Sequence, residues 1–180
     1  MILYINCCVR KNSRTDVIAR HLLSKLGQYT EVNPEKENLL PLNEERLEDR
    51  NNLIASGRLD NTIFDNAKKF AEADIIVISA PYWDLSFPAI LKIYIENIMV
   101  SGITFSYSPE GIPLGLCKAR KLYYISTAGG PFTANYGYDY IRSLCTDMFG
   151  IKETELIKAE MLDIDGNNPE EIVQAAIENI

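Results

Sequence analysis

The chain has 180 residues and a formal net charge of −7, from 18 Lys and Arg against 25 Asp and Glu. This length suits a single domain, residues 1–180, and the negative charge argues against partners such as nucleic acid or acidic membranes, which need a basic surface. Cysteines at positions 7, 8, 117 and 145 have neither zinc-finger nor Cys-x-x-Cys spacing. No apolar run is long enough for a signal peptide or a membrane span. We therefore expect a reduced, cytoplasmic protein without disulfides or a metal site.

Hydrophobic patterning predicts strands that alternate with helices along the chain. Short apolar runs rich in β-branched residues are typical of buried strands, and residues 75–78 are continuously apolar, which indicates a central parallel strand. The predicted strands are 2–6, 29–32, 75–79, 122–126 and 155–159, with a further extended segment at 103–107. The first predicted helix begins at residues 13–15 and ends at Leu26 with Gly27 as C-cap. The other predicted helices are one or two within 43–73 with a break near Gly57, 88–100, 138–149 closed by Gly150, and 169–177.

This alternation predicts an α/β fold in which a five-stranded parallel sheet has helices on both faces. In such sheets ligands bind outside the carboxyl ends of the strands. The loops that follow three of the strands, 7–15, 80–87 and 126–137, are therefore the candidate site.

The first of these loops leads into the first helix, where Ser13, Arg14 and Thr15 stand. The free N–H groups and the dipole of a helix start favour an anion such as a phosphate, to which the two hydroxyls and the guanidinium add donors and charge. We group Cys7, at the end of the preceding strand, with this site. An equally good interpretation is that Ser13 or Thr15 is a simple N-cap.

A different chemistry also fits the first loop. Cys8, Arg14 and Thr15 match the Cys-x5-Arg-Ser/Thr signature of tyrosine phosphatases, whose low-molecular-weight members place a nucleophilic thiolate after the first strand of a similar sheet. Two features weaken this match: the intervening residues contain no glycine, and no Asp-Pro acid stands near the carboxyl terminus. A low-molecular-weight phosphatase that uses Cys8 and Arg14 is thus an alternative.

The second and third loops carry a family resemblance. Residues 80–97 resemble the flavin-binding loop and following helix of the FMN-dependent NADH-azoreductases and related NAD(P)H quinone dehydrogenases. Two further segments match patterns of this family and follow in the same order along the chain. They are a Thr-Phe-x-Tyr segment with two glycines at 104–116 and a Ser-Thr-x-Gly-Gly loop at 126–130. The residues that keep the pattern of the second loop and its helix are Pro81, Trp83, Leu85, Pro88, Ala89, Leu91, Lys92, Tyr94 and Ile95. Asp84 departs from it, since the family commonly has Asn there.

The resemblance implies a flavodoxin-like fold with strand order 2-1-3-4-5, FMN as cofactor, and NAD(P)H as cosubstrate. Trp83 and Tyr82 can stack on the flavin ring, N–H groups of residues 83–85 can reach its polar edge, and Gly129 and Gly130 allow close approach of the backbone. The implied cofactor-binding residues are Cys7, Ser13, Arg14, Thr15, Pro81, Tyr82, Trp83, Asp84, Leu85, Ser126, Thr127, Ala128, Gly129 and Gly130.

The implied reaction passes a hydride from nicotinamide through flavin N5 to a quinone or an azo compound, in ping-pong fashion. Such chemistry needs no acid–base pair of side chains, and the sequence offers no obvious one. The predicted helix 88–100 is apolar nearly all round, which on a monomer would expose a large patch. We therefore expect a homodimer, unless residues 101–120 cover that face. A flavodoxin-type electron carrier is the second alternative.

Overall fold

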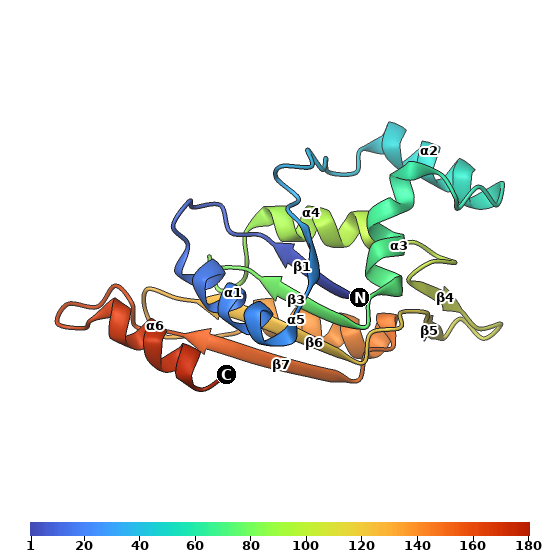
Figure 1. Cartoon of the computed structure of the whole chain (residues 1–180). Helices are drawn as coiled ribbons and strands as arrows, with labels where there is room; N and C mark the ends of the chain where they lie inside the picture. The colour runs from blue at the N-terminus through green and yellow to red at the C-terminus, as the bar shows by residue number, and fades with distance from the viewer.

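A five-stranded parallel sheet with the order β2-β1-β3-β6-β7 forms the centre of the molecule (Figure 1). The computed structural model describes residues 1–180. Counting only the five predicted strands, this order is 2-1-3-4-5, so the predicted flavodoxin-like arrangement is confirmed. The strands are β1 (Ile2–Asn6), β2 (Tyr29–Val32), β3 (Ile75–Ser79), β6 (Lys121–Thr127) and β7 (Glu153–Ala159).

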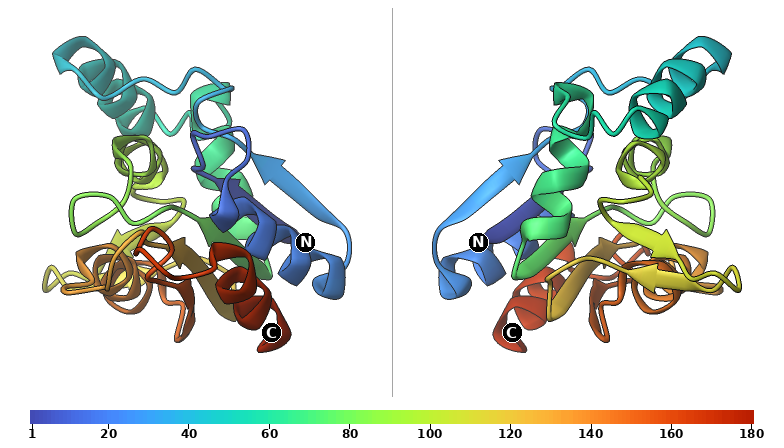
Figure 2. Two further views of the ribbon diagram at one scale, coloured as in Figure 1. Left: turned by 90° about the vertical axis from the view of Figure 1, so that its left-hand side faces the viewer. Right: turned by 90° about the vertical axis from the view of Figure 1, so that its right-hand side faces the viewer.

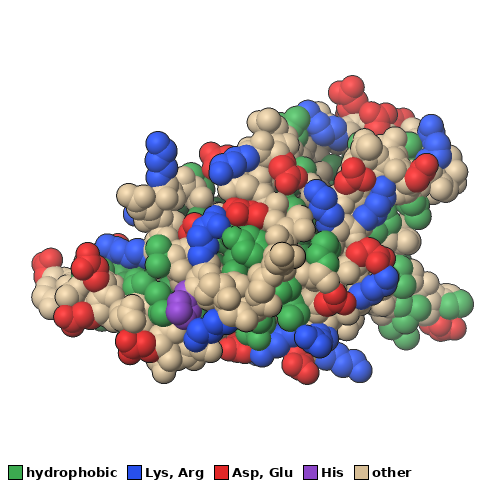
Figure 3. Space-filling model, viewed as in Figure 1, with side chains coloured by type: hydrophobic (Ala, Val, Ile, Leu, Met, Phe, Trp, Pro, Cys, Tyr) green, Lys and Arg blue, Asp and Glu red, His purple; other side chains and the backbone are tan.

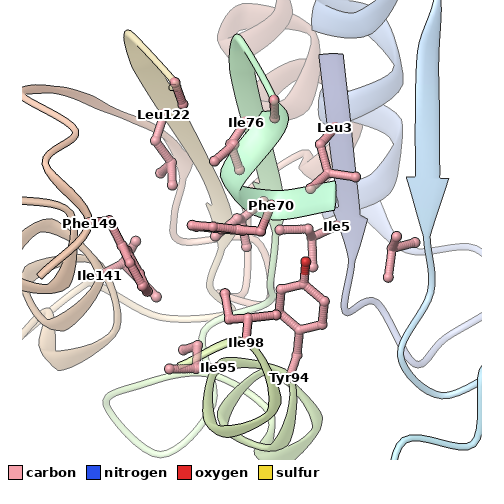
Figure 4. Packing of buried hydrophobic residues seen from close by; sticks show 14 of the residues in the cluster. Leu3, Ile5, Phe70, Ile76, Tyr94, Ile95, Ile98, Leu122, Ile141 and Phe149 are labelled. Carbon is pink, nitrogen blue, oxygen red and sulfur yellow. The ribbon is translucent and has the colours of Figure 1, made fainter. Parts of the chain in front are cut away.

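Helices cover both faces of this sheet, as Figure 2 shows from two sides. On one face α1 and α6 pack against Tyr4, Val77 and Ile125. On the other, α3, α4 and α5 build the larger core, in which Phe70, Tyr94 and their neighbours lie against the sheet (Figure 4). The helices are α1 (Arg14–Leu26), α2 (Glu44–Ala55), α3 (Asp65–Glu72), α4 (Ala89–Ile98), α5 (Tyr136–Leu144) and α6 (Pro169–Glu178), with a short 3-10 helix, η1 (Thr62–Phe64), before α3.

Helix boundaries differ from the prediction mainly around α5. The helix begins at Tyr136, because the side chain of Asn135 accepts a hydrogen bond from the N–H of Tyr138 and caps it there. After Leu144 the chain widens into a π-helix, η2 (Cys145–Phe149). Gly150 ends it with φ +78°, the left-handed conformation that glycine adopts without a steric cost.

The extended segment predicted at 103–107 belongs to a small hairpin outside the main sheet. Strand β4 (Phe105–Tyr107) pairs antiparallel with β5 (Pro113–Gly115). The hairpin packs on η2, where Gly115 lies against the backbone of Phe149 and Gly150. This added element closes the α5 side of the core at the end of the sheet opposite to the carboxyl ends of the strands.

Charged side chains of both signs are scattered over the face drawn in Figure 3, with no large area of one sign. This pattern fits a solvated surface. None of the helices has the length and apolar character needed to cross a membrane.

Candidate functional site

A cavity of about 350 Å³ opens at the carboxyl ends of β1, β3 and β6. Its size falls within the range of small-molecule sites, about 300–1,000 Å³. All three loops singled out in the sequence contribute to it. The predicted residues that line it are Ser13, Arg14, Thr15, Pro81, Tyr82, Trp83, Thr127, Ala128 and Gly129, joined by Val9, Arg10, Asn12, Leu162 and Asp163.

The remaining predicted residues do not line this cavity. Cys7 and Ser126 are almost fully buried, at 2% and 1% exposure. Asp84 and Leu85 are exposed at the tip of their loop, and Gly130 follows the lining residue Gly129. Cys7 and Ser126 thus lie beneath the cavity and not in its lining.

The helix start at α1 presents free hydrogen-bond donors to the cavity. Ser13 is the N-cap, and its hydroxyl accepts from the N–H of Asp16. The N–H groups of Arg14 and Thr15 have no acceptor within the chain. Because the positive end of the helix dipole lies at the same place, this half of the cavity is suited to a phosphate. The N-cap and the anion-site interpretations are therefore compatible, because Ser13 caps the helix while the backbone amides of the next two residues stay free.

A buried polar network supports this helix start from below. The hydroxyl of Tyr4 donates to the Asp16 carboxylate at 2.5 Å and lies 2.7 Å from the hydroxyl of Ser79. Burial, together with the neighbouring Asp16 carboxylate, raises the pKa of Tyr4 well above its usual range, so the phenol keeps its proton. The side chain of Asn6 donates to Asp16 and accepts from the N–H of Cys8, which ties the loop to the helix.

The second loop makes a tight turn from Trp83 to Ser86. Each of these two residues donates its N–H to the carbonyl of the other, at 3.2 and 2.8 Å. Asp84 and Leu85 between them have φ of +51° and +66°, as in a type I′ turn, a conformation that is strained for leucine. The predicted donor set 83–85 is thus narrowed, because the N–H of Trp83 is used inside the turn while those of Asp84 and Leu85 are free.

The two aromatic residues of this loop differ in their freedom. The ring of Tyr82 packs on Phe132 with centroids 4.4 Å apart, and its hydroxyl donates to the carbonyl of Ala134. Trp83 is 39% exposed at the cavity and has no aromatic partner. Trp83 is therefore the side chain that is free to stack on a planar ligand, whereas Tyr82 is held by Phe132 and Ala134.

The third loop is fastened by the segment that follows β7. Backbone N–H groups of Met161, Leu162 and Asp163 donate to the carbonyls of Gly130, Ala128 and Gly129. The amides of Gly129 and Gly130 themselves remain free. A Cβ atom on Gly129 would lie 2.4 Å from Oδ2 of Asp163, so only glycine fits here without moving that side chain.

The donor set of the three loops fits FMN. Free amides at Arg14 and Thr15 suit its phosphate, and those at the second and third loops suit the oxygen- and nitrogen-rich edge of its ring. Sequence reasoning missed Leu162 and Asp163, because nothing local to residues 161–167 signals that this turn reaches back to the first loop.

The environment of Cys8 does not favour the phosphatase alternative. Burial raises the pKa of the Cys8 thiol, outweighing the effects of Ser13 and Ser79 that lower it. A phosphatase nucleophile needs the opposite, a depressed pKa that leaves a thiolate at neutral pH.

A labelling experiment tests this point. Because burial raises the pKa of the Cys8 thiol, we expect iodoacetamide to label Cys8 at pH 7 roughly tenfold more slowly than a free cysteine, with the rate increasing as the pH is raised. Mass spectrometry of the Cys8 peptide measures the rate. Fast labelling at pH 7 together with hydrolysis of p-nitrophenyl phosphate would revive the phosphatase interpretation.

Comparison with known proteins agrees with the fold and the loops. A family model described as flavodoxin-like fold matches residues 1–180. A protein of Clostridium perfringens named FMN-dependent NADH:quinone oxidoreductase is 38% identical, over 98% of this chain and 94% of its own. One of Coprothermobacter proteolyticus with the same name is 33% identical, over 98% of this chain and 94% of its own. An azoreductase structure from Bacillus anthracis str. Sterne has a TM-score of 0.84 at 22% identity, covering 99% of this chain and 95% of that one, and so shows the fold alone.

Fold and site together define a protein of the flavodoxin class with a cavity at the carboxyl edge of its sheet. The chain belongs to the flavodoxin-like family that also contains the FMN-dependent NADH:quinone oxidoreductases named above.

Proposed function

We propose that the chain is an FMN-dependent NAD(P)H oxidoreductase that reduces a quinone or an azo compound. The observation that carries the proposal is the set of free backbone amides at Arg14, Thr15, Asp84, Leu85, Gly129 and Gly130, all in the loops around one cavity. Relatives named FMN-dependent NADH:quinone oxidoreductase, which align over nearly the whole chain, support the same assignment. We further propose that the protein is cytoplasmic.

In this proposal the three loops divide the binding of FMN between them. Ser13, Arg14 and Thr15 hold the phosphate, whereas residues 82–85 and 126–130 hold the ring. The chemistry that bound FMN supplies is the passage of a hydride from a reduced nicotinamide, through N5, to the acceptor in two successive half-reactions. The chain itself orients the ring through Trp83 and donates hydrogen bonds from fixed amides, which need no reorganisation during the reaction.

Flavin titration and rapid reduction test the proposal. Trp83 is the only tryptophan of the chain and lines the cavity, so FMN binding is expected to quench its fluorescence. Stopped-flow mixing of the FMN-bound protein with NADH or NADPH should then bleach the flavin absorption band at least as fast as the enzyme turns over with its acceptor. Absence of FMN binding would reject the proposal, and binding without reduction by either nicotinamide would favour the electron carrier.

Asp84 gives a more specific expectation. Its exposed carboxylate departs from the family pattern that the second loop resembles, which commonly has Asn there. Negative charge near the ring disfavours the anionic reduced flavin. Asp84→Asn is expected to raise the two-electron midpoint potential by on the order of 30 mV, about 1.4 kcal/mol. Asn adopts the left-handed conformation of this position as readily as Asp. A potentiometric titration that shows no change or a fall contradicts the expectation.

We also propose that the protein is a homodimer. Part of the outer surface of α4 is covered by α2, whose Arg50 side chain donates hydrogen bonds to the carbonyls of Glu96 and Met99. The segment before α2 covers another part, where Asn97 donates to the carbonyl of Leu40. The start of α4 is left open, beside Leu85 and Tyr136, which are 44% and 64% exposed. Sedimentation velocity at micromolar concentration is expected to give the mass of two chains, and a monomer mass counts against this proposal.

A further inference from the structure

The rim of the cavity holds an ion pair that the predicted site did not include. The guanidinium of Arg14 contacts the carboxylate of Asp163 at 2.8 Å, between residues 149 positions apart in the chain. Both side chains are substantially exposed, at 44% and 65%, and both line the cavity. The cation expected to hold a phosphate is therefore already paired with an anion of the protein.

We infer that Asp163 is an internal competitor for the phosphate of the cofactor, and that binding exchanges one anion for the other on Arg14. The inference rests on the proposed function and deepens it, because it assigns to Asp163 an effect on the affinity for FMN. Asp163 acts through Arg14 and is thus a positioning residue for the phosphate.

The backbone around Asp163 keeps the carboxylate in place. Three successive hydrogen bonds join residues 161–163 to residues 128–130, so the segment is fastened to the loop that also lines the cavity. Close contact with Gly129 limits where the side chain can lie. The carboxylate is consequently directed across the cavity rim toward α1 rather than left free in solvent.

The charges at this rim explain how Asp163 affects the binding of a phosphate. Arg14 stands at the positive end of the α1 dipole, and Arg10 on the same rim has no carboxylate partner. When no other anion is bound, Asp163 neutralises Arg14 and orients it. When a phosphate dianion occupies the free amides of Arg14 and Thr15, the same carboxylate is a like charge beside it, and Arg14 is better satisfied by the phosphate, with its greater charge.

Substitution of the carboxylate by its neutral isostere tests the inference. Asp163→Asn is expected to tighten FMN binding about fivefold, the size typical of an exposed ion pair. Binding of riboflavin, which has the ring but no phosphate, is expected to stay unchanged. Asp165→Asn removes the same charge from the same turn at a residue that forms no ion pair and does not line the cavity, and serves as the matched control. Quenching of Trp83 fluorescence measures all of these affinities.

A second variant distinguishes exchange on Arg14 from a general effect of charge. In an Arg14→Gln background, the gain from Asp163→Asn should shrink to about twofold or less, because no cation remains to be exchanged. Added salt should likewise diminish the difference between wild type and Asp163→Asn.

The results distinguish a failure of the inference from a failure of the proposed function. Equal gains in both backgrounds, parallel weakening of FMN and riboflavin, or no effect of Asp163→Asn on FMN would each overturn the inference while leaving the proposed function intact. If the wild-type protein binds neither flavin, the proposed function fails and the inference fails with it.

Discussion

Gly115→Ala should lower the free energy of unfolding by about 3 kcal/mol, an overpacking effect at the upper end of the usual range. A Cβ atom at this position would lie 2.2 Å from both the backbone N of Gly150 and the carbonyl carbon of Phe149. These are backbone atoms, so no side-chain rotation relieves the clash, and either β5 or the end of η2 must move. Urea denaturation followed by circular dichroism measures the loss.

Gly130→Ala is the matched control for this prediction. Gly130 does not have a left-handed φ, and a Cβ atom there would meet nothing within 4 Å. The same chemical change should therefore alter the stability of the protein without cofactor by no more than about 0.5 kcal/mol. If the two variants unfold at the same urea concentration, the close packing of the hairpin on η2 is not a determinant of stability.

Asp16→Ala should cost a similar amount, about 3 kcal/mol, for a different reason. The Asp16 carboxylate accepts hydrogen bonds from Tyr4, Asn6 and Arg20. Its removal leaves the fully buried Tyr4 hydroxyl with Ser79 as its remaining partner. It also leaves the Asn6 amide, whose carbonyl oxygen holds the first loop, with Glu31 as its remaining acceptor. We expect the midpoint of thermal or urea unfolding to fall and FMN binding to weaken.

Asp65→Ala provides the comparison. Asp65 is likewise an acid in the first turn of a helix, but it is exposed and pairs only with Lys68. Its replacement should cost no more than about 1 kcal/mol, the sum of a dipole and a surface-pair contribution. In a Tyr4→Phe background the cost of Asp16→Ala should decrease, because no buried hydroxyl is then left short of a partner. Equal losses for the two acid variants would show that the network adds nothing beyond a helix-start charge.

Much of the architecture could be read from local patterns. The apolar run at 75–78 identified the central strand, and the alternation of strands with helices led to the parallel sheet and to the three loops at its carboxyl edge. Such patterns are informative because burial on a strand or a helix repeats with the period of that element. The strand order and the flavin came instead from the resemblance at 80–97 and 126–130.

The sequence by itself thus determined the fold class, the position of the cavity and most of the residues that line it. Only the tertiary structure decided which hydrogen-bond donors are free and which charges are paired. The N–H of Trp83 is bonded inside the turn, whereas those of Asp84 and Leu85 are free. Tyr4, Asn6 and Asp16 form a network under the first loop, and Asp163 forms an ion pair with Arg14. The physical reason is that periodicity reports the burial of single residues within one element. A hydrogen bond or an ion pair between distant segments depends on the three-dimensional path of both, which no local pattern contains.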